Sequence, residues 1–124
     1  MNKSTILISI KPEYASKILD GIKKYEYRTT KAKNVNKMII YATSPVKKVI
    51  GEAEVKNILE DTPNNIWNKT KELSGTKKES FDNYFKNRNK AVAYEIGKTT
   101  RYDKPKELSE LGIDFVPQSY IYYK

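Results

Sequence analysis

The side chains best suited to chemistry lie in one short run, residues 21–28, with the sequence GIKKYEYR. It offers an amine at Lys23, a carboxylate at Glu26 and a guanidinium at Arg28. Glu26 and Arg28 are two apart on a predicted strand, so their side chains share a face. In a cleft, Lys23 would bind a phosphate or, once desolvated, act as a base or nucleophile. Glu26 would accept a hydrogen bond from a base edge or act as general base, while Arg28 holds a phosphate or orients Glu26.

Each of these residues also has a purely structural interpretation. Glu26 and Arg28 would then form an ion pair on a sheet face, because a buried charge needs a partner. Lys23 would be one solvated lysine among many. The choice depends on whether the three side chains converge on one concave surface.

Two residues at the first strand-to-helix junction form a second candidate group. Lys11 precedes a helix that begins at Pro12, and helix N-termini favour anions. Ser9 lies just before it on the predicted strand. The pair predicts an anion-binding position, with a solvated lysine and a sheet-lining serine as the alternative.

Four polar residues at strand ends complete the candidate binding set. Tyr41 can stack on a base, and Ser44 in a Thr-Ser-Pro turn can donate to a phosphate. Gln118 and Ser119 carry an amide and a hydroxyl, which suit the reading of a base edge. Core packing, turn formation and strand entry are the corresponding structural roles.

The composition excludes several classes of chemistry. The chain has no cysteine and no histidine, which excludes disulfides, thiolate or imidazole metal sites and histidine-based catalysis. We therefore expect no metal site and no cofactor. The net charge of +9 favours a polyanionic partner, with an AT-rich codon bias as the competing explanation. The short, serine-interrupted apolar N-terminal run and the lack of about 20 consecutive apolar residues predict a cytoplasmic protein without a membrane partner.

The periodicity predicts an α+β fold in one domain, residues 1–124, with a helical insertion at residues 61–88. No repeating βα unit is present, so a doubly wound sheet is not expected. Five or six short strands favour a small, mixed, mainly antiparallel β-barrel, partly open and with helices at its openings. Strands are expected at 5–10, 23–29, 38–42, 46–59, 91–96 and 119–123, and helical segments at 12–20, 62–73, 80–85 and 105–111.

Aromatic and apolar residues near these elements are expected to form the core. Tyr25 and Tyr27 lie on the strand face opposite Glu26. Ile66, Trp67 and Leu73 recur at helical spacing and should face the interior.

Four segments together resemble the ASCH family, which shares the PUA-like barrel. They are SIKPEYA at 9–15, GIKKYEYR at 21–28, YATSP followed by VIGE at 41–52, and PQSY at 117–120. The resemblance implies a function that involves RNA. Some small members, which resemble this chain, are amidohydrolases that deacetylate N4-acetylcytidine with a lysine, a threonine and a glutamate. Other members are ribonucleases. Their lysine matches Lys23, whereas their threonine falls at Glu26.

Three functions follow as hypotheses. The first is binding of RNA or of a modified nucleoside or nucleotide, in RNA processing or regulation. The second is hydrolysis, as an amidohydrolase on N4-acetylcytidine or a related nucleoside or as a ribonuclease, with Lys23 and Glu26 as the catalytic groups. The third is a protein-interaction or regulatory module that uses residues 61–88; the sequence identifies no protein partner for it.

Overall fold

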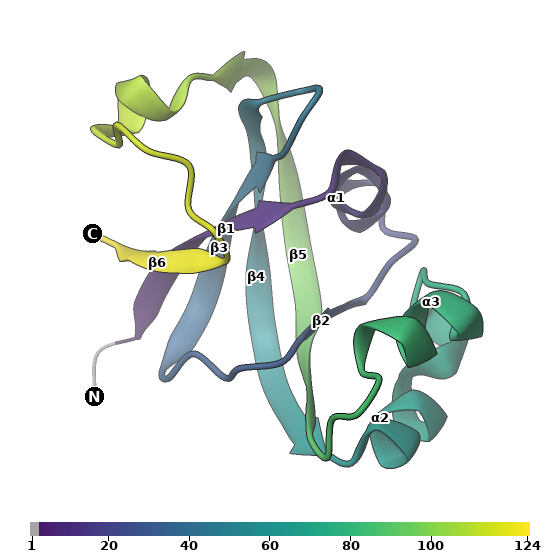
Figure 1. The fold of residues 1–124 in the computed structure, drawn as a ribbon. Helices are drawn as coiled ribbons and strands as arrows, with labels where there is room; N and C mark the ends of the chain where they lie inside the picture. The colour runs from purple at the N-terminus through teal and green to yellow at the C-terminus, as the bar shows by residue number, and fades with distance from the viewer. Residues whose placement is uncertain (1–2) are drawn as a thin grey trace.

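The structure is a computed structural model that describes residues 3–124. In this range one six-stranded sheet has the order β2-β5-β4-β3-β1-β6 (Figure 1). β1 and β3 are parallel, and the other neighbours are antiparallel. The fold is therefore α+β with a mixed, mainly antiparallel sheet, as predicted. The strands are β1 (Ser4–Ile10), β2 (Tyr25–Arg28), β3 (Val35–Ala42), β4 (Lys48–Asp61), β5 (Ala91–Lys106) and β6 (Tyr120–Tyr123).

Three α-helices lie on one side of the molecule in Figure 1, with α1 above α2 and α3. α1 (Pro12–Leu19) begins with proline at its first turn, where the missing N–H costs nothing. α2 (Pro63–Thr70) begins the same way, and the Thr62 hydroxyl accepts a hydrogen bond from the Asn65 N–H at 3.3 Å. α3 (Lys78–Tyr84) follows the short 3₁₀ helix η1 (Lys71–Leu73), and η2 (Leu108–Leu111) precedes the last strand.

Alternation along the strands divides the apolar residues between the two faces of the sheet. Ile6, Ile8 and Ile10 of β1 enter the main core with α1, whereas Leu7 packs with Ile39 on the other face. The C-terminal segment covers that second face. Each fully buried isoleucine or leucine contributes about 1.5–3 kcal/mol to the hydrophobic driving force.

A smaller core holds α2 and α3 against β2. Tyr27 packs there with Ile66, Phe81 and Phe85, and Trp67 is partly buried against them. The Tyr27 and Phe81 rings meet edge to face, with centroids 4.9 Å apart. The prediction that Leu73 faces the core is wrong: its side chain is 52% exposed. η1 departs from α-helical geometry after Thr70, which breaks the spacing that the prediction used.

β5 is longer than predicted, because it continues from the expected end at Ile96 to Lys106. Its second half is polar and mostly exposed, so periodicity does not reveal it. Backbone pairing with β4 holds it there, with Thr100 opposite Glu52 and Arg101 opposite Gly51. The helical turn expected from 105 accordingly starts only at Leu108.

The predicted barrel, expected to be partly open, is not confirmed. The sheet is open, with β2 and β6 at its edges. A side-chain hydrogen bond, and not backbone pairing, connects β2 to β1. Arg28 of β2 donates to the Ser9 carbonyl at the end of β1, 2.7 Å away. Among residues 3–124, no helix has the length and apolar character needed to cross a membrane.

Candidate functional site

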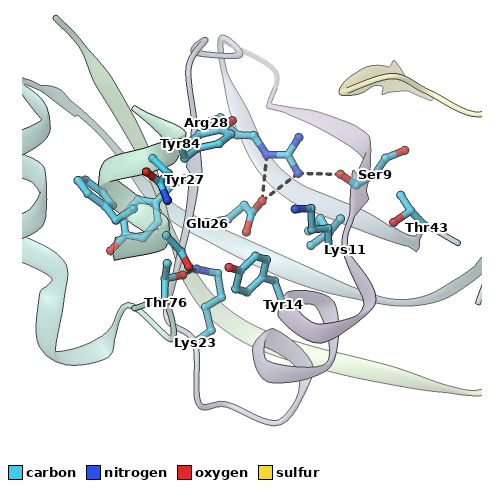
Figure 2. Close-up of a pocket in the computed structure, with 14 residues that line it drawn as sticks. Ser9, Lys11, Tyr14, Lys23, Glu26, Tyr27, Arg28, Thr43, Thr76 and Tyr84 are labelled. Atoms are coloured by element: carbon cyan, nitrogen blue, oxygen red, sulfur yellow. Dashed lines mark hydrogen bonds and ion pairs between the residues drawn. The ribbon is translucent and has the colours of Figure 1, made fainter. Parts of the chain in front are cut away.

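A pocket of about 660 Å³ opens between the β1–α1 junction and α3, and β2 runs between these two sides in Figure 2. This volume falls within the range of small-molecule sites, which is about 300–1,000 Å³. Its lining combines aromatic rings with a few convergent polar groups. The lining residues are Ser9, Ile10, Lys11, Tyr14, Lys23, Glu26, Tyr27, Arg28, Thr43, Thr76, Ser80, Phe81, Asn83 and Tyr84.

Lys23 reaches the pocket through the turn that ends α1. Gly21 adopts a φ of 78°, which reverses the chain, and the N–H groups of Ile22 and Lys23 both donate to the Lys17 carbonyl. The Lys23 side chain is then 1% exposed. Its Nζ donates to the Ser74 carbonyl at 2.8 Å and to Thr76 Oγ1 at 2.9 Å.

The Lys23 ammonium also lies over two aromatic rings. Its Nζ is 4.7 Å from the ring centroid of Tyr27 and 5.1 Å from that of Tyr14. Burial lowers the pKa of Lys23 to about 8, an effect that the nearby Glu26 carboxylate partly offsets. At pH 7 Lys23 is therefore mainly protonated, with the free amine as the minor form. Lys23 is therefore available mainly as an ammonium ion and, to a smaller extent, as a neutral amine.

Gly75 lets the loop after η1 pack directly on Lys23. It has a φ of +64°, and a Cβ built there would lie 2.5 Å from the Cβ of Lys23. Glycine is required on both counts, conformation and space. The loop thus positions Ser74 and Thr76 around the amine.

Glu26 and Arg28 form a partly buried pair beside Lys23. Glu26 is 5% exposed, and its Oε2 accepts from Arg28 Nε at 2.9 Å and lies 2.8 Å from Arg28 Nη2. The other carboxylate oxygen, Oε1, accepts no hydrogen bond from any described residue. Arg28 also contacts Ser119 Oγ at 3.4 Å, so its guanidinium is largely committed to the fold. Glu26 therefore keeps one acceptor for a ligand.

The predicted site residues divide into two groups. Lys23, Glu26, Arg28, Ser9 and Lys11 all line the pocket. Ser9 uses its hydroxyl to donate to the Pro117 carbonyl at 2.6 Å, which anchors the C-terminal segment. Lys11, at the start of α1, is exposed and extends toward the pocket in Figure 2.

The structure does not bring the remaining predicted residues into the pocket lining. Tyr41 packs with Leu7 and Ile39 in the core on the other face, so base stacking in this pocket has no support. Ser44 and Gln118 are exposed and lie outside the lining. Ser119 also lies outside it and bears on the site only through Arg28.

Several residues that line the pocket are not among those predicted from the sequence. Thr76, Ser80, Asn83 and Tyr84 come from the region after η1, more than forty positions beyond residues 21–28. Tyr27, predicted to serve the core, serves both the core and the pocket wall. The spacing of Ser80, Asn83 and Tyr84 on α3 is the one sequence signal that marks a shared helix face. Within residues 3–124, no three acidic side chains are grouped to hold a metal ion.

Comparison with known proteins assigns the segment that holds most of these residues to a protein family. The family model for the ASCH domain matches residues 8–100. The chain is 34% identical over 122 residues to the large ribosomal subunit protein uL22 of Ureaplasma parvum serovar 3, covering 97% of this chain and 39% of that protein. It is 30% identical over 95 residues to the ASCH domain-containing ribonuclease of Zymomonas mobilis, covering 75% of this chain and 64% of the relative. The chain thus spans only part of the length of both relatives.

The fold comparison agrees with the sequence comparison. The crystal structure of ASCH from Zymomonas mobilis superposes with a TM-score of 0.91 at 27% identity. The match covers 99% of this chain and 90% of that one. The element order and the sheet described above are therefore shared nearly end to end.

Proposed function

The chain belongs to the ASCH domain family, and from this premise we propose that it binds RNA, with the pocket holding one nucleotide of an unpaired strand. The observation that carries the proposal is the convergence of the buried Lys23 ammonium and the Glu26 carboxylate on one cavity of nucleoside size. A donor for phosphate or carbonyl oxygen thus lies beside an acceptor for N–H groups. The aromatic lining suits a flat base.

The charge of the chain supports a polyanionic ligand. The net charge is +9, and Lys11 lies exposed at the rim of the pocket. Lysines along a phosphate backbone release counterions, so binding weakens as salt increases. A pocket for the base and exposed lysines for the backbone together describe a single-strand binding site.

Titration of single-stranded RNA, duplex RNA and single-stranded DNA, followed by fluorescence anisotropy, tests the proposal. We expect the single-stranded RNA to bind most tightly and to lose affinity between about 50 and 200 mM salt. Excess mononucleotide should compete. Absence of binding to every nucleic acid at low salt would refute the proposal.

Hydrolysis is the second candidate, and the contact between Lys23 and Thr76 favours it. The Lys23 ammonium donates to Thr76 Oγ1 at 2.9 Å, and after it loses its proton, which a pKa of about 8 allows, it can take the hydroxyl proton as a base beside a nucleophile. The relative from Zymomonas mobilis is called a ribonuclease. Incubation with single-stranded RNA and with N4-acetylcytidine, followed by chromatography, distinguishes ribonuclease, amidohydrolase and binder. Lys23→Met should abolish any product; unchanged turnover would reject this chemistry.

The third hypothesis, a protein-interaction surface at 61–88, has no observation of its own in its favour. Within that segment, α3 contributes directly to the pocket wall.

A further inference from the structure

One face of α3 forms the wall of the pocket opposite the β1–α1 junction. Ser80, Asn83 and Tyr84 all line the pocket, at positions i, i+3 and i+4 of the helix. Residues at this spacing lie on one helical face. The neighbouring Phe81 is 2% exposed and anchors the helix in the smaller core. The packing of Phe81, which also lines the pocket, therefore holds this face of α3 in place.

Tyr84 offers an aromatic surface beside the charged groups. Its side chain is 48% exposed, and its ring meets the Phe85 ring edge to face with centroids 4.8 Å apart. Figure 2 shows Tyr84 next to Arg28, on the side of the pocket opposite Lys23. Partial burial raises the pKa of the Tyr84 hydroxyl, and the nearby Arg28 opposes that shift. The ring is thus neutral at physiological pH and fixed by its neighbour.

Asn83 offers a hydrogen-bonding group with no assigned structural task. Its side-chain amide forms no hydrogen bond with residues 3–124, although its backbone carbonyl accepts bonds at the end of α3. An amide carries both donors and an acceptor, so it can pair with a base edge through two bonds. It lies in the same wall as Tyr84 and faces the cavity that Glu26 lines.

We propose that α3 is the base-recognition wall of the pocket, with Tyr84 stacking on one unpaired RNA base and Asn83 hydrogen-bonding the edge of that base. This inference rests on the proposed RNA-binding function and names the residues that choose the base. Lys23 and Lys11 then contact the sugar-phosphate or a base carbonyl. A base already paired in a duplex cannot enter, because both its faces and its edge are occupied.

Binding of four homo-oligomeric single-stranded RNAs to Tyr84 and Asn83 variants tests this assignment. Tyr84→Leu should weaken binding of all four by about tenfold, because stacking tolerates any base. Tyr84→Phe should bind like the parent. Asn83→Ala should reduce the ratio between the best and worst oligomer by about tenfold. Neither change removes a charge, so the dependence of affinity on salt should stay constant.

Matched control variants exist outside the pocket. Tyr122 is 51% exposed, close to the exposure of Tyr84, and Asn89 is an exposed asparagine. Tyr122→Leu and Asn89→Ala should change affinity and base preference by less than about twofold. Circular dichroism melts of all variants confirm folding. Leucine retains the apolar contact with Phe85, so Tyr84→Leu is expected to fold.

The outcomes distinguish failure of RNA binding from failure of the recognition role of α3. If the parent protein binds none of the oligomers, the proposed function fails. If the parent binds RNA while Tyr84→Leu and Asn83→Ala match their controls, the recognition role of α3 is wrong and RNA binding stands. Loss of affinity in Tyr84→Phe would assign the effect to the hydroxyl and overturn stacking.

Discussion

Arg28 contacts Glu26 through a single carboxylate oxygen, Oε2, at 2.8 Å from Nη2, while Nη2 also donates to the Ser9 carbonyl. The same guanidinium therefore holds a pocket residue and ties the β2 edge of the sheet to β1. The pair therefore stabilises the sheet and, in the proposed site, also holds Glu26 in place for a ligand. The consequences can be measured separately.

Removing the arginine should destabilise the fold strongly. Arg28→Ala leaves the Glu26 carboxylate, 5% exposed, without its partner, and the expected cost is about 3 kcal/mol in the free energy of unfolding. Urea denaturation measures it. Adding Glu26→Gln to Arg28→Ala should restore part of the loss, because the buried charge is gone.

The surface pair of Arg101 and Asp20 is the matched control. Its side chains are 46% and 51% exposed at a distance of 2.8 Å. Arg101→Ala should cost less than about 1 kcal/mol. Equal costs for Arg28→Ala and Arg101→Ala would show that the Glu26 pair is not buried in solution.

The loop that holds Lys23 should not accept a side chain at Gly75. Gly75→Ala combines a left-handed backbone, φ +64°, with a methyl group 2.5 Å from Lys23 Cβ. Gly112 has a similar φ of +79°, but no atom lies within 4 Å of the place that an alanine methyl group would take, so Gly112→Ala isolates the backbone cost.

Thermal or urea unfolding compares the two glycine variants. We expect Gly112→Ala to lose about 1 kcal/mol and Gly75→Ala to lose at least twice as much. Gly75→Ala should also weaken RNA binding, because Lys23 must move. Identical losses would mean that the loop does not pack on Lys23.

Burial of Lys23 gives stability a defined pH dependence. Its folded pKa of about 8 lies below the ordinary 10.5, so between these values the unfolded chain binds more protons than the native one. Unfolding free energy therefore rises with pH in that window, and the penalty is fully present below pH 8. From pH 8 to pH 10 the gain is about 2 kcal/mol.

Denaturation at several pH values, for the parent and for Lys23→Met, measures this effect. As the pH rises from 8 to 10, the unfolding free energy of the parent should increase relative to that of Lys23→Met. Lys24→Met, which alters the half-buried neighbour, should leave the slope of the parent intact. A slope that persists in Lys23→Met would assign the titration to another group.

Lys11 should act through charge alone. It is exposed at the start of α1, and Lys11→Ala should reduce the slope of log affinity against log salt by about 0.7, the value for one phosphate contact on a single strand. Stability should change by less than about 0.5 kcal/mol. An unchanged slope would place the RNA backbone elsewhere.

Sequence patterns predicted the helix starts and the strand faces, because interactions between residues close together in the chain determine them. Proline at Pro12 and Pro63 starts helices, and the alternation of Ile6, Leu7 and Ile8 divides β1 between two cores. The same alternation already assigns Tyr41 to the face of Ile39, which the base-stacking interpretation overlooked. The grouping of Lys23 with Glu26 and Arg28 follows from their short separation along the chain.

The missed wall of the pocket depends on contacts between distant segments. Asn83 and Tyr84 line the same pocket as Glu26 because Phe81 and Phe85 pack on Tyr27. No spacing in the sequence encodes that contact. The polar end of β5 was missed for a similar reason, since pairing with β4 rather than burial determines it.

RNA binding by Lys23→Met and Lys24→Met at pH 7 tests whether the pocket is where the RNA binds. Both variants remove one positive charge from adjacent positions, but only Lys23 lines the pocket. We expect Lys23→Met to weaken binding of single-stranded RNA by at least about tenfold, as for loss of a charged hydrogen bond, and Lys24→Met by less than about threefold. Equal effects of the two substitutions would contradict the account, because the pocket would then not be where the RNA binds.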